Sequence, residues 1–482
     1  MVTRQVTTRY GVVEGLAAED PDITVFRGVP FAASPVGALR WRAPQPAEAW
    51  DGVLQAHDFA ASPMQPQWNP DDFYGREWGM DPDTPRDEDC LYLNIWTPAL
   101  RGTGTSTTLH AEAKPDGASE PTGPGLPVMV WIYGGAYQCG TPAEKEFDGA
   151  ALARLGVIVV SIAYRLNAFG FLTHRDLATR AQVAGEPCAN FGLLDQRAGI
   201  DWVRRNIAAF GGDPERITVF GQSAGAASTL AQICSPMNDG LFRRAIMQSG
   251  AGLGVFNAHL PSLADAQDTG RRFLDLLDVA DIDEARRIPA DELLDAAGQL
   301  PVPPDSGRDG DWPMLVNWVP CIDGRFLTAQ YGDTLRAGRM QCETIMIGNT
   351  TGEFLDTLPD GTTTAAGELG NLALADAWMA GGGVAPYYYR FDVAMPGDDA
   401  GAFHSSDLWF TFDSLGTCWR PFDGWHYELA DAMSRHWANF AVTGDPNGPD
   451  RHGDPLPHWE RFDPHTRAAM RFAEHGGMQY DW

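Results

Sequence analysis

The sequence predicts an α/β protein with a mostly parallel central sheet and helices on both faces of that sheet. Two uninterrupted apolar runs, 126–133 and 157–164, have the composition of strands that are buried on both faces. An amphipathic helical pattern over 190–210 and a β-prone stretch that begins at Ile217 follow them. This alternation of strand and helix is typical of a parallel sheet with right-handed crossovers.

The composition is typical of a large globular protein with an acidic surface. The 482 residues include 44% hydrophobic residues and 16 tryptophans, which is ample for a well-packed core. The formal net charge of −29 disfavours contact with nucleic acid or anionic lipid, so we expect no nucleic-acid partner and no membrane partner. A chain of this length can form one domain or several. Because neither an internal repeat nor a clear boundary is visible, we treat 1–482 as a single domain.

The first ten residues lack the apolar core of a signal peptide, and no apolar run is long enough to span a bilayer. The seven cysteines are widely scattered, odd in number and without the spacing of a metal site. We therefore expect a cytoplasmic protein with reduced, mostly buried thiols.

Other elements are expected around this centre. Short apolar runs over 1–60 predict a small N-terminal β-meander, and a loop rich in proline and aromatic residues follows over 61–89. Residues 101–125 are rich in Gly, Thr, Ser and Pro and are expected to form an exposed loop. Helical periodicity predicts inserted helices over about 255–340. Further strands are expected at 90–96, 243–249, just before Glu353 and at 386–392, and a final helix at 430–441 precedes an irregular tail.

The sequence Gly221-Gln222-Ser223-Ala224-Gly225 lies between the strand that begins at Ile217 and an Ala-rich helical run. The pattern alone fits an ordinary turn as well as a nucleophile elbow, but the strand before it and the helix after it favour the elbow. Small residues two positions from Ser223 let neighbouring elements approach closely, and N–H groups at a helix start stabilise negative charge. We therefore predict that Ser223 is a nucleophile.

A serine nucleophile needs a base within hydrogen-bond reach, and that base needs a carboxylate to orient it. In hydrolases with such an elbow the order along the chain is nucleophile, acid, histidine. The histidines after Ser223 are His259, His404, His426, His436, His452, His458, His465 and His475. His404 alone follows both a late strand and a candidate acid, so we predict His404 as the base.

The acid has three candidates. Glu353 lies just past a strand end, and Asp356 and Asp407 are close competitors. Each of the three can equally be a solvated loop carboxylate without a catalytic role. The residue pattern alone leaves this choice open.

A turn with two glycines, Gly134-Gly135-Ala136-Tyr137, follows the apolar run at 126–133. Its consecutive N–H groups can bind an oxyanion, but the glycines can also serve a tight turn with positive φ. The turn by itself does not decide between the two.

Several motifs occur in a fixed order over nearly the whole chain. They are 26–31 (FRGVPF), 35–41 (PVGALRW), 88–94 (EDCLYLN), 131–137 (WIYGGAY), 164–172 (YRLNAFGFL), 192–197 (GLLDQR), 210–214 (FGGDP), 221–225 (GQSAG), 401–404 (GAFH) and 440–447 (FAVTGDPN). In this order they resemble the type-B carboxylesterases, a family that includes the cholinesterases and bacterial enzymes similar to para-nitrobenzyl esterase. So many motifs in one order make a chance agreement improbable.

The resemblance implies an α/β-hydrolase fold and a carboxylic-ester hydrolase that forms an acyl-enzyme. The residues that it implies are Ser223, Glu353 and His404 as the catalytic triad, Gly135, Ala136 and Ala224 as the oxyanion hole, and Ser249 as a support of the acid and the histidine. We expect a small to medium neutral ester as substrate, and the chemistry requires neither metal nor cofactor.

Three departures from the family pattern are visible. Cys90 usually pairs with an upstream cysteine in the family, but the matching region around 61–66 has none. Ala136 replaces a glycine that is more usual in the oxyanion turn, so its methyl group is expected to narrow the acyl side. The stretch between Glu353 and His404 is shortened, and Gly352-Glu353-Phe354 stands where Asp-Glu-Gly is usual. The last departure bears most on the choice of the acid.

Competing functions follow from the same residues. A non-catalytic, cholinesterase-like binding protein loses the serine or the histidine, so the presence of Ser223 and His404 argues against it. A hydrolase of amides, carbamates or lactones is compatible with the sequence, which also leaves the oligomeric state and the role of 101–125 open. The aromatic residues proposed to line an apolar pocket are Trp68, Phe73, Trp78, Tyr137 and Trp409.

Overall fold

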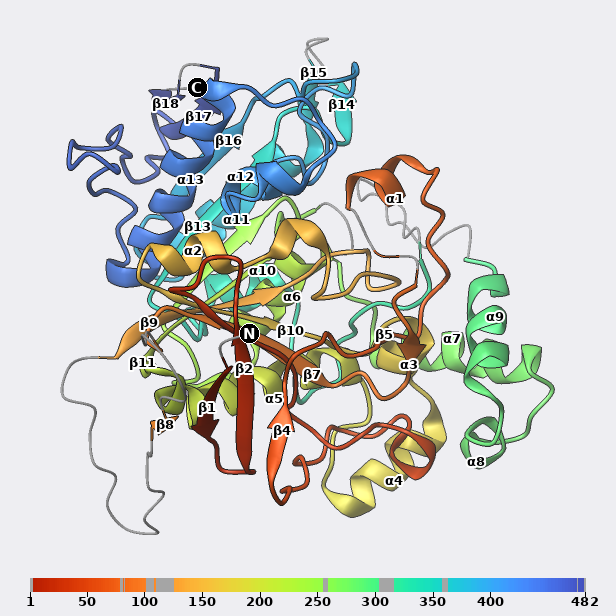
Figure 1. The fold of residues 1–482 in the computed structure, drawn as a ribbon. Coiled ribbons are helices and arrows are strands. Elements are labelled where there is room, and N and C mark those ends of the chain that lie inside the picture. The colour runs from red at the N-terminus through yellow and green to blue at the C-terminus, as the bar shows by residue number, and fades with distance from the viewer. Residues whose placement is uncertain are drawn as a thin grey trace.

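A 14-stranded sheet runs through the protein (Figure 1). The computed structural model describes residues 3–78, 81, 83–100, 108–109, 125–254, 259–302, 316–357, 363–474 and 476–480. The strand order is β18-β17-β16-β13-β12-β11-β9-β10-β7-β3-β2-β1-β8, with β4 paired to β2. This arrangement confirms the prediction of an α/β fold with a large central sheet.

Parallel strands form the centre of the sheet. These strands are β9 (Leu126–Ile132), β10 (Ile158–Ile162), β11 (Gly212–Gln222), β12 (Arg244–Gln248), β13 (Thr344–Thr350), β16 (Tyr387–Phe391) and β17 (Ala469–Ala473). Each pairs in parallel with its neighbours within this group. Every residue of β10, β12 and β13 is buried, as expected for strands that are covered on both faces.

Antiparallel strands extend both edges. On the N-terminal side they are β1 (Thr3–Thr7), β2 (Val12–Ala17), β3 (Thr24–Pro30) and β7 (Tyr92–Thr97). Two short strands, β4 (Val53–Gln55) and β8 (Thr108–Leu109), add in parallel to β2 and β1. The meander is therefore confirmed, and the rest of the 101–125 loop, apart from Gly125, lies outside the described residues. At the far edge β18 (Gly476–Tyr480) pairs with β17, so the expectation of an irregular tail was wrong there.

Two groups of helices cover the sheet. The first comprises α5 (Phe191–Asn206), α6 (Ala224–Cys234), α10 (Tyr331–Arg336) and α11 (Ala366–Ala380). The second comprises α2 (Ala150–Arg154), α12 (Leu408–Thr411) and α13 (Gly424–Thr443). Figure 1 shows α2 and α13 above the central strands and α5 below them. Among the described residues, no helix has both the length and the apolar character needed to cross a membrane.

Further helices lie in the segment expected to hold an insertion. They are α7 (Leu263–Leu276), α8 (Ile282–Ala285) and α9 (Ala290–Gln299), and α9 contacts α3 (Asn167–Phe171). Residues 255–258 and 303–315 of this segment lie outside the described part of the chain, so its bounds stay a prediction.

The remaining short elements lie in the connections. They are η1 (Gly37–Leu39), β5 (Ser62–Pro63), α1 (Phe73–Glu77), β6 (Arg86–Asp87), η2 (Lys145–Phe147), α4 (Arg175–Ala184), η3 (Ile207–Phe210), η4 (Pro236–Asn238), β14 (Leu355–Thr357), β15 (Thr363–Ala365) and η5 (Leu415–Thr417).

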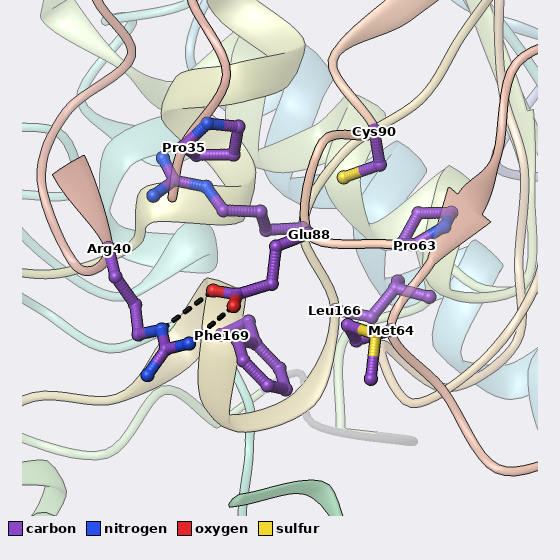
Figure 2. Close-up of a pocket in the computed structure, with 9 residues that line it drawn as sticks. Pro35, Arg40, Pro63, Met64, Glu88, Cys90, Leu166 and Phe169 are labelled. Atoms are coloured by element: carbon purple, nitrogen blue, oxygen red, sulfur yellow. Dashed lines mark hydrogen bonds and ion pairs between the residues drawn. The ribbon is translucent and has the colours of Figure 1, made fainter. Parts of the chain in front are cut away.

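Cys90 is a free, buried thiol at the base of the aromatic loop. It lines an internal space of about 10 Å³ together with Met64, and Figure 2 shows the ion pair between Arg40 and Glu88 at the same place. Arg40 Nε donates to Glu88 Oε1 at 2.7 Å. The base of the loop is therefore held by this ion pair and by packing.

The far end of the same loop is held by a buried ion pair. Arg420 donates from Nε and Nη2 to both oxygens of Glu77 at 3.0 and 2.8 Å, and the two side chains are 0% and 1% exposed. Arg420 Nη1 also donates to Asp398 at 2.7 Å. Because Glu77 ends α1, this pair fixes the helix against the segment that carries His404.

Glu146 is a buried carboxyl group in η2 without a hydrogen-bond partner for either oxygen among the described residues. Burial raises the pKa of Glu146 well above its usual value, and the neighbouring Glu144 adds to this effect. A buried acid with a raised pKa keeps its proton in the folded state at a pH where the unfolded chain has released it. Its contribution to stability is therefore present at low pH and is lost as the pH rises above about 4.5, the ordinary value for glutamate.

We predict that Glu146→Gln raises the midpoint of thermal unfolding at pH 8. The amide keeps the shape of the side chain and cannot ionise. In the wild type, the proton held by Glu146 changes the free energy of unfolding by about 1.4 kcal/mol per pH unit once the unfolded chain has released it. The advantage of the variant should shrink as the pH is lowered towards 5. Glu19→Gln, at an exposed position, is the control and should show no such pH dependence. An equal midpoint for wild type and Glu146→Gln at pH 8 would contradict the prediction.

Candidate active site

Ser223 lies on the sharp turn between β11 and α6, as the sequence predicts. Its backbone has φ 56° and ψ −127°, a conformation that is strained for any residue other than glycine. A Cβ atom on Gly225 would lie 2.0 Å from the carbonyl oxygen of Ile132 in β9, and one on Gly221 would lie 2.5 Å from the carbonyl carbon of Gly225. The two glycines of the motif are therefore required by the close approach of α6 to β9.

Three side chains from separate loops form a continuous hydrogen-bonded series. Ser223 Oγ donates to His404 Nε2 at 2.9 Å, and His404 Nδ1 donates to Glu353 Oε2 at 2.5 Å. The side chains of His404 and Glu353 are 11% and 1% exposed. Glu353 follows β13 and His404 follows β16, so both loops leave the same edge of the sheet as Ser223. This arrangement can deprotonate the serine and stabilise the resulting imidazolium.

The carboxylate of Glu353 also faces the start of α11. A Cβ atom on Gly367 would lie 3.2 Å from Glu353 Oε1, so glycine leaves room for this oxygen. The N-terminus of a helix carries partial positive charge and favours a carboxylate beside it. Glu353 therefore lies between His404, through Oε2, and the first turn of α11, beside Oε1.

The competing acids occupy other environments. Asp407 is fully buried and accepts from Gln248 Nε2 at 2.9 Å and from Tyr389 Oη at 2.7 Å. Burial raises the pKa of Asp407 to about 6. Asp356 lies in β14, and its side chain is outside the described residues. Of the candidates, the structure brings Glu353 to His404.

His404 alone, of the described histidines, hydrogen-bonds to Ser223. His426 and His436 lie in α13, where they bond to Asp423 and to the carbonyl of Pro446. Burial lowers the pKa of His436 to about 4, so this residue is neutral within the core. His475 lies outside the described residues.

The turn after β9 lines the same cavity as Ser223. Gly135, Ala136 and Tyr137 have φ of 98°, 54° and 63°, and a Cβ atom on Gly135 would lie 2.1 Å from the carbonyl oxygen of Cys139. Within the described residues, the N–H groups of Gly135, Ala136 and Ala224 donate no hydrogen bond. All three residues line one cavity with Ser223. Unpaired N–H donors in a turn and at the N-terminus of a helix can stabilise an oxyanion.

This cavity has a volume of about 320 Å³. Aromatic side chains make up much of its wall, and they come from Tyr74, Trp78, Tyr137 and Phe354. Burial raises the pKa of Tyr74 to about 12, with Glu353 adding to the effect, so this phenol stays neutral. The described residues of the lining include no Asp, Glu, Lys or Arg.

The aromatic residues expected in the pocket divide into two sets. Trp78 and Tyr137 line the cavity. Trp68 packs against Trp78 with ring centroids 4.9 Å apart, Phe73 packs against Phe403, and Trp409 is buried.

Ser249 lies at the end of β12 and lines the cavity, with φ 52°. Its Oγ accepts from the N–H group of Thr350 at 3.4 Å. The contact therefore reaches the strand that leads to Glu353, and Ser249 makes no hydrogen bond to the carboxylate or to His404 among the described residues.

Gln222 is a further residue at the site that the sequence did not single out. Its Nε2 lies 3.2 Å from His404 Nε2, and the side chain is buried. Its place directly before Ser223 is the only signal in the sequence that points to this contact.

The carboxylesterase family model matches residues 2–371 and 362–480. The chain belongs to the carboxylesterase family. It is 33% identical to the fumonisin B1 esterase of Sphingopyxis macrogoltabida over 510 residues, which cover 95% of this chain and 84% of that protein. It is 35% identical to the para-nitrobenzyl esterase of Bacillus subtilis over 365 residues, which cover 75% of this chain and 65% of that protein.

The fold is similar to that of a solved Geobacillus stearothermophilus carboxylesterase, with a TM-score of 0.75 and 32% identity over 99% of this chain and 97% of that chain. The family and these similarities identify a carboxylic-ester hydrolase with the α/β-hydrolase fold. Ser223 and His404 are both present in this chain and are hydrogen-bonded to each other. This contact does not support the alternative of a non-catalytic binding protein.

We predict that Glu353→Gln lowers kcat by about 10³ to 10⁴, because an amide holds the wrong histidine tautomer and does not stabilise the imidazolium. Asp407→Asn, a matched change of a buried carboxyl group that does not hydrogen-bond to His404, should lower kcat by less than about tenfold. Steady-state kinetics of both variants, with circular dichroism to show that they are folded, tests the assignment. The opposite order of the two effects would move the acid to Asp407.

Proposed function

We propose that Ser223, His404 and Glu353 form the catalytic triad of this esterase. The observation that carries the proposal is the hydrogen-bonded series from Ser223 through His404 to Glu353, together with the residues of unpaired N–H groups that line the same cavity. Ser223 Oγ attacks the ester carbonyl carbon while its proton passes to His404 Nε2. The negative oxygen of the tetrahedral intermediate accepts hydrogen bonds from the N–H groups of Gly135, Ala136 and Ala224.

His404 then donates the proton to the alcohol oxygen, the carbon–oxygen bond breaks and the alcohol leaves. Water attacks the acyl-enzyme with His404 as the base, and the acid is released as Ser223 recovers its proton. Each proton transfer in this sequence takes place at Nε2 of His404. The cycle uses side chains, backbone N–H groups and water, and requires neither metal nor cofactor.

The proposed substrate is a small to medium neutral ester. A cavity of about 320 Å³ has room for such a molecule, and its aromatic wall offers apolar contacts. The absence of Asp, Glu, Lys and Arg from the described lining disfavours charged groups on the substrate. The similarity to a para-nitrobenzyl esterase supports an uncharged ester as well.

The remaining features of the proposal concern the surroundings of the enzyme. Seven free cysteines fit a reducing compartment, which supports a cytoplasmic location. The net charge of −29 disfavours binding to nucleic acid or anionic lipid.

We predict that the wild type hydrolyses para-nitrophenyl acetate and butyrate and that Ser223→Ala lowers the rate by at least about 10⁴, as in other triad serine variants. Release of para-nitrophenol measures the rate, and circular dichroism shows that the protein is folded. Ser34→Ala, a serine outside the site, is the matched control and should keep wild-type activity. A folded wild type that is inert toward both esters, or an active Ser223→Ala, would refute the proposal.

A further inference from the structure

Phe354 occupies a strained position directly after Glu353. Its φ of 42° lies in the left-handed region, where a bulky aromatic residue is an outlier. The surroundings hold this conformation, because the carbonyl of Phe354 accepts from the N–H group of Ala366 at 3.0 Å, where α11 begins. Glycine adopts such a φ without strain and is the residue that the resemblance leads one to expect there. Strain that persists beside a catalytic centre points to a function of the side chain.

The ring of Phe354 lies at the catalytic histidine. Its centroid is 4.7 Å from that of the His404 imidazole, with 59° between the two planes. The side chain is 37% exposed and lines the cavity that contains Ser223. The ring is therefore part of the cavity wall, and core burial alone does not explain why it is there.

The chemistry of ester cleavage decides which part of the substrate meets this ring. The leaving alcohol oxygen must lie within hydrogen-bond reach of His404 Nε2 to receive its proton. The alcohol portion of the ester therefore lies near the imidazole, and Phe354 packs against that imidazole in the same cavity. Tyr74 and Trp78 line the same cavity, and their rings are stacked with centroids 4.6 Å apart.

We propose that Phe354 is a specificity-determining residue that selects esters of aromatic alcohols by contact with the alcohol portion. This inference rests on the proposed triad, because His404 fixes the place of the leaving oxygen. An aromatic ring gains from an edge-to-face or offset contact with another ring, beyond the area that it buries. An alkyl ring of similar size lacks this gain, so the selectivity is expressed between two alcohols of matched bulk.

The test compares benzyl acetate with cyclohexylmethyl acetate, which share the acyl group and present similar leaving groups. We expect Phe354→Leu and Phe354→Gly to lower the ratio of the two kcat/KM values about fivefold. Most of the change should appear as a higher KM for benzyl acetate, since the contact exists before and during the reaction. Phe354→Tyr retains a ring and should retain the ratio.

Phe59→Leu is the matched control, because Phe59 is 38% exposed and contacts Arg27, away from the cavity. It should leave the ratio unchanged. An unchanged ratio in Phe354→Leu and Phe354→Gly, or an equal loss on both esters, would overturn the role of Phe354 and leave the esterase function standing. A folded wild type that is inactive on both esters would overturn the proposed function together with this inference.

Discussion

The contact between the first turn of α6 and the end of β9 is the constraint on which the site depends. Gly225 lies so close to Ile132 that no side chain fits between them. On the other side Gly250 lies against Ser223, where a Cβ atom would be 2.0 Å from the carbonyl oxygen of Ser223. Ser223, the proposed nucleophile, is therefore held in a strained conformation from two directions, and its hydroxyl group projects from the end of β11 with little freedom. Parallel strands then bring the turn after β9, Glu353 and His404 to the same edge.

The histidine loop is also tied to the aromatic loop that covers the cavity. Trp78 donates from its indole nitrogen to Ser405 at 3.1 Å, next to His404. The buried ion pair of Arg420 and Glu77 holds α1 in place directly before Trp78. A buried ion pair contributes little net stability, since both charges lose their hydration, but removing one partner leaves an unpaired buried charge. We therefore regard this pair as a contact that positions the cavity wall, in a loop that contains no cysteine and is followed by the free thiol of Cys90.

Much of the fold and the core of the site followed from the sequence, for physical reasons that differ from residue to residue. Apolar runs locate buried strands because both faces of a parallel strand exclude water, and the glycines around Ser223 reflect a close approach that only glycine permits. The residue pattern alone did not select Glu353, which the family resemblance implied, because a carboxyl group near a strand end has the same local pattern whether it meets His404 or solvent. The strands of the tail were missed because β17 is held by pairing with β16, which is distant in sequence. Gln222 was missed because its contact exists only once the histidine loop is in place.

Backbone strain is concentrated where the chemistry takes place. Five of the twelve non-glycine residues with positive φ in the described chain line the catalytic cavity, and they are Ala136, Tyr137, Ser223, Ser249 and Phe354. Glycine would relieve this strain at each position, so stability alone does not account for the residues that are present. At Ser223 the side chain is the proposed nucleophile, and at Tyr137 and Phe354 it forms part of the cavity wall. The conformational cost is thus located at residues that line the cavity, and the surrounding close contacts of Gly225 and Gly250 keep the strained turn at Ser223 from relaxing.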